Sequence, residues 1–367
     1  MRALMLTTDA FGGRGGLAKY NRDFIKSLCL CDATREVVVI PRICTSEVEP
    51  LPAKVTFVLD GLGGKSRFLA TALGRMMHRT SFDLVVCGHV NLLPIALLAA
   101  WRYRAPLVLC VYGIDVWRSP PSRAAARACA HIDGFVSISR LTADRFRSWA
   151  PLDGKREWIL PNAIELDQFS PGPMDPGLVK RYGLEGRTVI ATLARLDAAE
   201  RMKGVDEVLE VLPRLLRRAP RLTYLVMGDG SDKSRLEEKA RAIGVANSVV
   251  FTGAIDEREK VEHYRLVDAF VMPSRGEGFG FVFLEALACG IPVVASAVDG
   301  GREAVRDGEL GVLVDPRSPD DIVRGIEEAL AKPRGVVPPG LSYFAFENFT
   351  SRVQAFVDDV VPRSAES

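Results

Sequence analysis

The chain has 367 residues, of which 48% are hydrophobic and 26% charged, and its formal net charge is +2. These values predict a globular protein large enough for two domains. No run of 18 uninterrupted apolar residues occurs, and the seven cysteines include no Cys-x-x-Cys pair, which argues against a spanning helix, a disulfide framework and a zinc site.

The small net charge conceals an uneven distribution along the chain. Residues 1–165 hold 22 Lys/Arg against 14 Asp/Glu, a balance of +8, whereas residues 166–367 hold 26 against 32, a balance of −6. The basic first half predicts an anionic surface or an anionic acceptor there.

Residues 1–9 lack the apolar core and cleavage site of a signal peptide and favour a first strand, so we expect a protein of the reducing cytoplasm.

Short apolar runs alternate with helical patterns throughout the chain, which indicates βαβ units and parallel sheets. The strands predicted in the first half are 3–7, 37–40, 55–58, 84–87, 107–111, 134–137 and 158–160. Those predicted in the second half are 189–193, 222–227, 249–252, 269–273, 292–295 and 311–314. A Pro/Gly-rich linker at 161–173 separates the two series. The fold class is therefore expected to be α/β, with two Rossmann-like domains.

A glycine-rich loop, 12–16, follows the first strand and precedes a helix predicted at 17–28. Its glycines satisfy a loose dinucleotide-binding fingerprint, and this leaves a nicotinamide-dependent dehydrogenase as an alternative function. The next strand, however, ends in Pro41 and Arg42 and not in an acid that could hold a ribose.

Two further features of the first half could serve binding. Residues 65–79 form a basic amphipathic helix candidate, and 101–104 add a Trp-Arg-Tyr-Arg cluster. Both favour contact with anionic lipid headgroups, although a solvated helix packed on the sheet is an equally good interpretation. His89 follows a predicted strand and could face a ligand or be a satisfied structural residue.

In the second half, polar residues follow several predicted strands. Arg195 ends one strand, and Lys203-Gly204 opens the helix after it. Gly228 and Gly253, the latter followed by Ile255, come after the next two strands and could equally be ordinary strand-to-helix turns. Open α/β sheets bind ligands at the carboxyl ends of their strands, which makes this edge the candidate site.

The most informative segment is 277–285, which follows an apolar strand. Glu277 lies in a glycine-flanked turn, and Glu285 lies on the helix that starts there. The amides of residues 280–282 (Gly280, Phe281 and Val282) are expected helix N-terminal donors that suit a phosphate. Two carboxylates beside a phosphate site indicate hydroxyl recognition, as on a sugar ring or a ribose.

With the residues that follow it, this segment resembles the Glu-x7-Glu motif of retaining glycosyltransferases of family 4. The resemblance implies the GT-B fold, in which two doubly wound Rossmann-like domains face each other across a cleft. It implies an acceptor-side domain at 1–165, with a C-terminal helix at 344–367 crossing back to it, and a nucleotide-sugar-binding domain at 166–343.

The resemblance also assigns roles to residues. Glu277 would bind the hydroxyls of the transferred sugar, Glu285 the ribose, and Arg195 with Lys203 the leaving diphosphate. The other positions implied for the donor side are Gly16, Gly228, Gly253, Ile255, Phe279, Gly280, Phe281 and Val282. Positions expected on the acceptor or sugar side are Gly15, His89, Tyr112 and Asp115. Tyr112 stands where the family has a histidine, so a general-base role does not carry over to it, and Asp115 could instead only cap the following turn.

No Asp-x-Asp triplet and no metal-ligand spacing occur in the sequence, so we expect transfer without a metal or other cofactor. The expected substrates are a UDP- or GDP-linked sugar and a hydroxyl acceptor, lipid-linked or an oligosaccharide of surface-polysaccharide assembly. An anionic membrane, with the protein peripheral on its inner face, is a further expected partner, and nucleic acid is not. The alternatives left open are a sugar-nucleotide epimerase or phosphorylase-like enzyme, the dehydrogenase and a non-catalytic nucleotide-sugar binding module.

Overall fold

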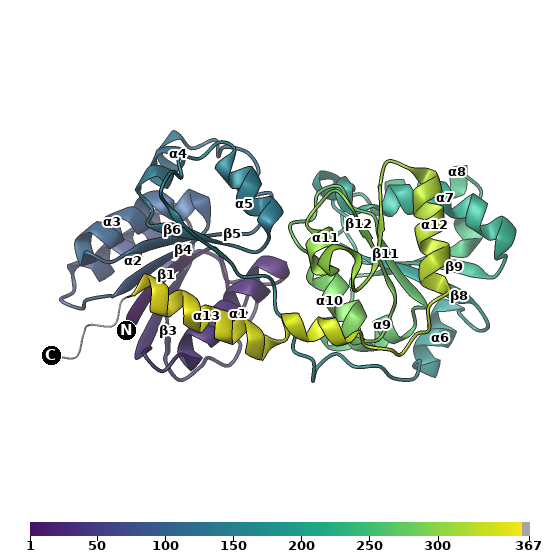
Figure 1. Cartoon of the computed structure of the whole chain (residues 1–367), viewed down its shortest axis with the longest axis horizontal. Helices are drawn as coiled ribbons and strands as arrows, with labels where there is room; N and C mark the ends of the chain where they lie inside the picture. Colours follow the sequence, from purple (N-terminus) through teal and green to yellow (C-terminus); the bar gives the residue numbers. More distant parts are fainter. Residues whose placement is uncertain (362–367) are drawn as a thin grey trace. The chain divides into compact units, whose positions relative to one another are not determined.

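The computed structural model describes residues 1–361, and the chain divides into two compact units (Figure 1). The first consists of Met1–Ala163 together with the C-terminal helix α13 (Phe346–Val360), and the second of Ile164–Ala345. The sequence-based boundary at 165/166 lies two residues from this division. Residues 362–367 of the expected C-terminal helix lie outside the described residues.

The first unit is built on a parallel sheet with the strand order β3-β2-β1-β4-β5-β6-β7. Its strands are β1 (Arg2–Thr7), β2 (Glu36–Pro41), β3 (Val55–Phe57), β4 (Leu84–Gly88), β5 (Leu107–Val111), β6 (Gly134–Ser137) and β7 (Arg156–Ile159). Its other helices are α1 (Gly16–Leu30), α2 (Lys65–Met77), α3 (Leu93–Tyr103), α4 (Arg123–Ala128) and α5 (Arg140–Arg147).

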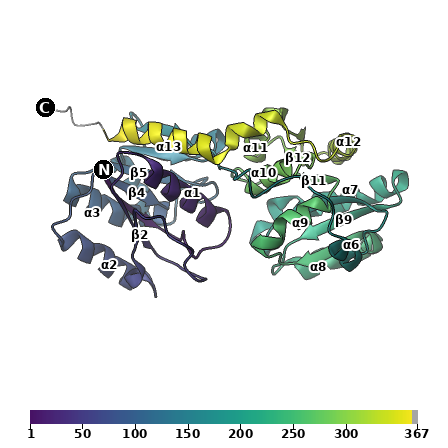
Figure 2. The ribbon, with the colours of Figure 1, turned by 90° about the horizontal axis from the view of Figure 1, so that it is seen from below.

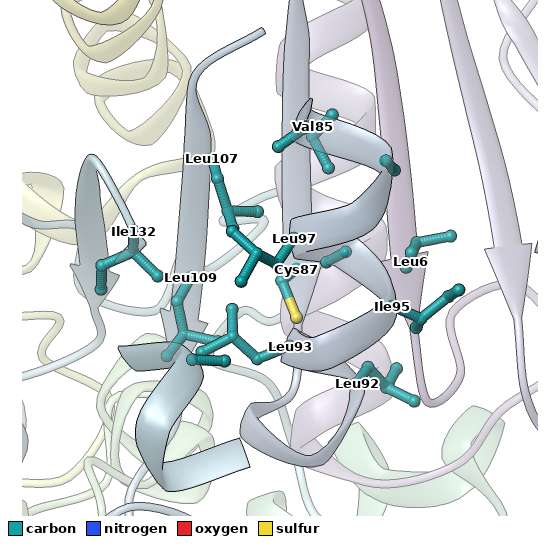
Figure 3. Packing of buried hydrophobic residues seen from close by; sticks show 14 of the residues in the cluster. Leu6, Val85, Cys87, Leu92, Leu93, Ile95, Leu97, Leu107, Leu109 and Ile132 are labelled. Carbon is teal, nitrogen blue, oxygen red and sulfur yellow. The ribbon is translucent and has the colours of Figure 1, made fainter. Parts of the chain in front are cut away.

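Helices cover both faces of this sheet. Crossovers between parallel strands are right-handed, and the chain moves in opposite directions after β1 and after β4. Helices α1 and α3 therefore lie on opposite faces, with α13 beside α1 and α2 beside α3 (Figure 2). On the α3 face, Leu93 and Leu97 pack against Cys87 of β4 and Leu109 of β5 in one buried apolar cluster (Figure 3).

Helix α13 completes the other face of the first unit. Its Phe349 ring lies 5.7 Å from that of Tyr20, and its Phe356 ring lies 5.8 Å from that of Phe24. The four rings are buried, and aromatic pairs at such distances stabilise a contact beyond the area they bury. Helix α13 is thus part of the core of the first unit, although the 182 residues of the second unit lie between it and the rest of the first in the chain.

The second unit also has a parallel sheet, with the order β10-β9-β8-β11-β12-β13. Its strands are β8 (Thr188–Leu193), β9 (Leu222–Met227), β10 (Val249–Gly253), β11 (Ala269–Met272), β12 (Val293–Ser296) and β13 (Val312–Val314). Its helices are α6 (Pro176–Tyr182), α7 (Val205–Arg218), α8 (Lys233–Ala242), α9 (Lys260–Arg265), α10 (Phe281–Ala288), α11 (Gly301–Ala304) and α12 (Pro319–Leu330).

The direction of chain travel in the second unit reverses at the centre of the sheet. From β8 the chain crosses to β9, whereas from β11 it crosses the other way to β12, and β8 and β11 are neighbours. Such a reversal is where open α/β sheets bind ligands, beyond the carboxyl ends of the strands. The α/β class with two Rossmann-like units is confirmed, and every predicted strand is present in the described residues with its ends within two residues of those expected.

The helices expected at 17–28 and 65–79 are α1 and α2. Among residues 1–361, none of the helices combines the length and the apolarity needed to cross a bilayer.

Candidate active site

The loops after β8 and β11 meet at the reversal point and pair two predicted site residues. Lys203 ends the short 3-10 helix η4 (Ala198–Lys203), directly before α7, and its Nζ lies 2.7 Å from Oε2 of Glu277. The two side chains are 20% and 16% exposed. Burial alone would lower the pKa of Lys203, but the Glu277 carboxylate raises it above its ordinary value, so the amine is a fixed cation at neutral pH.

Arg195 follows β8 and lies in the same loop system. Its side chain is 68% exposed, with Nη1 3.3 Å from Oε1 of Glu200. Most of the stretch between Arg195 and Lys203 is η4, which begins after Asp197. The Asp197 side chain accepts a hydrogen bond from the amide of Ala199. Arg195 and Lys203 therefore flank one ordered turn, and a solvent-facing guanidinium and a largely buried amine are both available to an anion.

The backbone of the Glu277 loop is held from two sides. On one side, the Arg275 amide donates to the Met202 carbonyl at 2.8 Å. On the other, the Glu277 amide donates to Oδ2 of Asp299 at 2.9 Å, and the Gly300 amide donates to the Glu277 carbonyl at 2.9 Å. The loops after β8, β11 and β12 are thereby fixed to one another.

Glycines permit the close approach of the strand ends. A Cβ at Gly228 would lie 1.9 Å from the Ala194 carbonyl oxygen, and one at Gly230 would lie 2.2 Å from that of Leu196. Both glycines also have positive φ, 136° and 156°, which side chains rarely adopt. The Gly228 amide donates to the Gly253 carbonyl at 3.0 Å, so the structure brings these two predicted residues together and only Gly fits at position 228.

Glu285 of α10 is 1% exposed and paired. The Tyr264 hydroxyl donates to Oε2 at 2.8 Å, and Lys260 Nζ lies 3.4 Å from Oε1. Burial next to Glu285 raises the pKa of Tyr264 well above its ordinary value, so this phenol stays a donor. A carboxylate has about four lone-pair positions, which leaves acceptor capacity for a ligand hydroxyl.

The remaining donor-side positions surround the start of α10. The helix begins at Phe281 after Gly280, whose φ is 94°, as the sequence predicted. In its first turn the Phe283 amide donates to the Gly280 carbonyl at 3.3 Å, and amides at the start of a helix point out of its N-terminal end. The Phe279 side chain is buried, with its ring 5.5 Å from that of Phe344, so only its backbone can face a ligand. Ile255 lies in the partly exposed loop after β10.

In the first unit, the glycine loop leads directly into α1. Gly15, with φ 86°, precedes the helix, and Gly16 is its first residue. His89 follows β4 and caps the short 3-10 helix η2 (Val90–Leu92), where its Nδ1 accepts from the Asn91 amide at 3.1 Å. Burial and, secondarily, Arg42 lower the pKa of His89. The hydrogen bond with Asn91 gives His89 a structural role as a helix cap, and a further role in ligand binding through Nε2 stays a prediction.

Tyr112 and Asp115 organise the loop after β5. The Tyr112 hydroxyl donates to Asn21 Oδ1 at 2.6 Å, and its amide donates to Oδ1 of Asp115 at 3.1 Å. Asn21 in turn donates to Thr7 Oγ1 at 2.8 Å. Burial raises the pKa of Tyr112 well above its ordinary value and that of Asp115 to about 7. Tyr112 is thus a fixed donor unsuited to accepting a proton. Asp115 caps the turn that begins at Tyr112, which precedes it in the chain, and its capping of the following turn stays a prediction.

Sequence reasoning overlooked several residues that complete these networks. Asp299 follows β12 in an Asp-Gly-Gly sequence, and that strand-end position could have identified it. Asn21, Lys260 and Tyr264 lie inside helices, α1 in the first case and α9 in the others, where nothing local marks them. Within residues 1–361, no three His, Cys, Asp or Glu side chains are grouped as metal ligands would be.

Comparison with known families covers both units. Residues 14–168 match the model of the glycosyltransferase family 4, and residues 180–336 match that of the glycosyl transferases group 1. The chain is similar to the GDP-mannose-dependent alpha-(1-6)-phosphatidylinositol monomannoside mannosyltransferase of Mycolicibacterium smegmatis. The two are 35% identical over 302 residues, 78% of either chain. It is also similar to the D-inositol 3-phosphate glycosyltransferase of Streptomyces bingchenggensis, 27% identical over 88% of this chain and 78% of the relative.

Solved structures share the fold at lower identity. The trehalose-6-phosphate synthase OtsA superposes with a TM-score of 0.74 at 14% identity, covering 99% of this chain and 100% of its own. Anabaena Alr3699/HepE in complex with UDP superposes with a TM-score of 0.68 at 17% identity, covering 98% and 96%.

Proposed function

Because the chain belongs to glycosyltransferase family 4, with the GT-B fold, we propose that it transfers a sugar with retention, without a metal ion, from a nucleotide sugar to a membrane-linked hydroxyl acceptor. The observation that supports this most is the Lys203–Glu277 pair at 2.7 Å, beside Arg195 and the start of α10. It combines a cation for a leaving diphosphate with a carboxylate for sugar hydroxyls.

The roles proposed for residues of the second unit follow from their charge and from the hydrogen bonds that they can form. Arg195 and Lys203 stabilise the diphosphate as negative charge develops on it, helped by the amides of residues 280–282. Glu277 accepts hydrogen bonds from the transferred sugar, and Glu285 from the ribose. The relatives' names favour GDP-mannose as the first donor to test and an inositol-bearing or lipid-linked glycan as the acceptor.

The roles in the first unit are assigned more narrowly. Gly15 and Gly16 leave the start of α1 open to the sugar or its phosphate, and the Nε2 position of His89 is available to an acceptor hydroxyl. Tyr112 and Asp115 shape the acceptor side as fixed donor and loop cap, which follows from their bonds to Asn21 and to each other. No residue of this set is proposed as a general base.

The proposal that no metal is needed rests on the two cations Arg195 and Lys203. They would neutralise the charge of the diphosphate, as a metal ion does in other enzymes. The purified protein is incubated with GDP-mannose, then with a panel of UDP- and ADP-sugars, with and without EDTA, and nucleotide release is measured. Turnover that survives EDTA supports the proposal, and activity lost to EDTA and restored by magnesium or manganese contradicts it. The anomeric configuration of the product, read by NMR before it equilibrates, tests retention.

A surface of the first unit supports a peripheral membrane location. Large apolar side chains of α2 and α3 face solvent: Met77 is 86% exposed, Trp101 62%, Leu98 46%, and Leu69 and Leu73 43% each. The two helices are joined at their ends, where Tyr103 donates to the Arg75 carbonyl at 3.0 Å. Exposed apolar side chains in such number on neighbouring helices mark an interaction surface.

The charge of α2, α3 and the segments beside them indicates the partner of this surface. Residues 61–114 contain six Lys/Arg and a single acid, Asp83. The six basic residues are Lys65, Arg67, Arg75, Arg79, Arg102 and Arg104. Basic residues beside exposed apolar ones fit an anionic leaflet, with about 1 kcal/mol for each residue near it. We therefore place the protein on the anionic inner face of a cell membrane.

Sedimentation with vesicles tests this location. Binding to vesicles containing anionic lipid at low salt, weakened at high salt because the Debye length shrinks, is expected. Replacing Met77 and Trp101 by Ser should reduce it, whereas Val336→Ser, which changes a side chain 59% exposed in the second unit, should not. Equal binding to neutral vesicles, or none at low salt, would favour a soluble acceptor.

A further inference from the structure

A second buried carboxylate lies behind Glu277 and has no part in the roles proposed above. Asp299, in the turn between β12 and α11, is 3% exposed. Its Oδ2 accepts from the Ser274 hydroxyl at 2.7 Å and from the Glu277 amide at 2.9 Å. Its Oδ1 accepts from the Gly301 amide at 3.0 Å. One side chain therefore ties the start of α11 to both ends of the turn that carries Glu277.

The two turns also touch through their backbones. The Gly300 amide donates to the Glu277 carbonyl at 2.9 Å, and a Cβ at Gly300 would lie 2.1 Å from the Gly278 carbonyl oxygen. Asp299 thus acts on the backbone of Glu277 on one side, while Lys203 holds its carboxylate on the other. Together they determine where the Glu277 carboxylate lies.

The chemistry of this position calls for a carboxylate. Three donors converge on two oxygens, and an amide side chain could accept at only one of them. Burial raises the pKa of Asp299 to about 6, so it is ionised at neutral pH at a cost in stability. Two charged groups interact with it electrostatically: Glu277, which opposes its ionisation, and Lys203, whose own pKa it helps to raise. Buried acids without a direct cationic partner are uncommon and concentrate at functional sites.

We infer that Asp299 is a positioning residue for the transfer reaction, which fixes the turn of Glu277 so that its carboxylate meets the hydroxyls of the transferred sugar. The inference rests on the role proposed for Glu277. It predicts that loss of Asp299 impairs sugar transfer and leaves binding of the nucleotide nearly unchanged, because Asp299 holds neither the Lys203 loop nor α10 directly.

Kinetics with Asp299→Ala and Asp299→Asn test this role. We expect kcat with the sugar nucleotide to fall about 10- to 100-fold in the alanine variant, as misplacement of a reacting group by about 1 Å does. The asparagine variant, which keeps one acceptor, should lie between it and the wild type. The dissociation constant of GDP or UDP without a sugar should change less than threefold.

The matched control is Asp321→Ala, which removes another acid that accepts a backbone amide, that of Asp315 at 2.7 Å, on α12 of the same unit. It should leave kcat unchanged. A kcat within twofold of the wild type in Asp299→Ala would overturn the inference. So would a loss of nucleotide affinity as large as the loss of kcat, because that indicates general damage to the unit.

Hydrogen exchange separates this inference from the proposed function. Amides of residues 274–280 should exchange at least tenfold faster in Asp299→Ala than in the wild type, and those of α12 should not change. If the wild type transfers no sugar, the proposed function fails. Faster exchange in Asp299→Ala would still show that Asp299 fixes the turn that carries Glu277. If the wild type is active and exchange in 274–280 is unaltered, the positioning role alone is refuted.

Discussion

Replacing Lys203 by Met tests the donor site most directly. The amine contacts the Glu277 carboxylate and is proposed to contact the diphosphate as well. Methionine keeps the unbranched shape and removes the charge. The amine lies 2.7 Å from Glu277, and both side chains are largely buried. The substitution therefore removes the proposed cation from the diphosphate and also leaves the Glu277 carboxylate without its partner.

The two losses have different magnitudes and different readouts. Loss of one preorganised group that stabilises transition-state charge costs roughly 2.7–4 kcal/mol, or about 100- to 1,000-fold in kcat. An unpaired, mostly buried carboxylate costs about 1–3 kcal/mol of folding free energy. The variant should thus lose most of its turnover at saturating donor and also unfold at lower denaturant concentration.

A double-mutant cycle with Glu277→Gln separates these effects. Unfolding in urea should show the stability loss relieved in Lys203→Met/Glu277→Gln, because no unpaired charge remains, while kcat stays low. Arg201→Ala is the control, since this cation of the same short helix pairs with Asp232 at 2.8 Å. If Lys203→Met kept kcat within threefold of the wild type, its role at the diphosphate would be wrong.

Three further outcomes are expected. Glu285→Gln should raise KM for the donor more than it lowers kcat, which steady-state kinetics would show and an unchanged KM would contradict. Gly228→Ala, whose Cβ would lie 1.9 Å from Ala194 O, should cost several times the stability lost in Gly244→Ala, where φ is 78° and no atom lies within 4 Å; equal losses in urea unfolding would refute this. Because the pKa of Asp299 is raised to about 6 from 3.8, its folded form binds a proton that the unfolded form lacks between these values. Wild type should therefore gain about 2 kcal/mol relative to Asp299→Asn as pH falls from 7 to 4, and a pH-independent difference would contradict it.

The fold was predictable from the sequence because parallel strands buried on both faces are continuous apolar runs. Most strands, including the short β13, follow that rule, whereas the edge strands β3, β7 and β10 are only partly buried and β7 begins with Arg-Glu. The clustering of residues at strand ends was also predictable, since their position alone puts them at the edge where open α/β sheets bind ligands, as with Arg195 and Glu277.

The partners of those residues were not predictable in the same way. Lys260 and Tyr264 reach Glu285 from α9 through the packing of two helices, and their spacing resembles that of any amphipathic helix. Tyr112 stands at the position of a family histidine, yet only its contact with Asn21 shows that it is a fixed donor. Such pairings depend on tertiary structure, which the local sequence does not encode.

The place of α13 in the first unit has a consequence for synthesis on the ribosome. The second unit is continuous in the chain, whereas the first lacks α13 until Phe346 has been added, 183 residues after Ala163. At about 5–20 residues per second this takes roughly 10–40 s. During that time the apolar side of α1, with Tyr20 and Phe24, has no cover. The half that is made first is therefore completed last, and nascent chains are exposed to aggregation or chaperone binding at α1 during this interval.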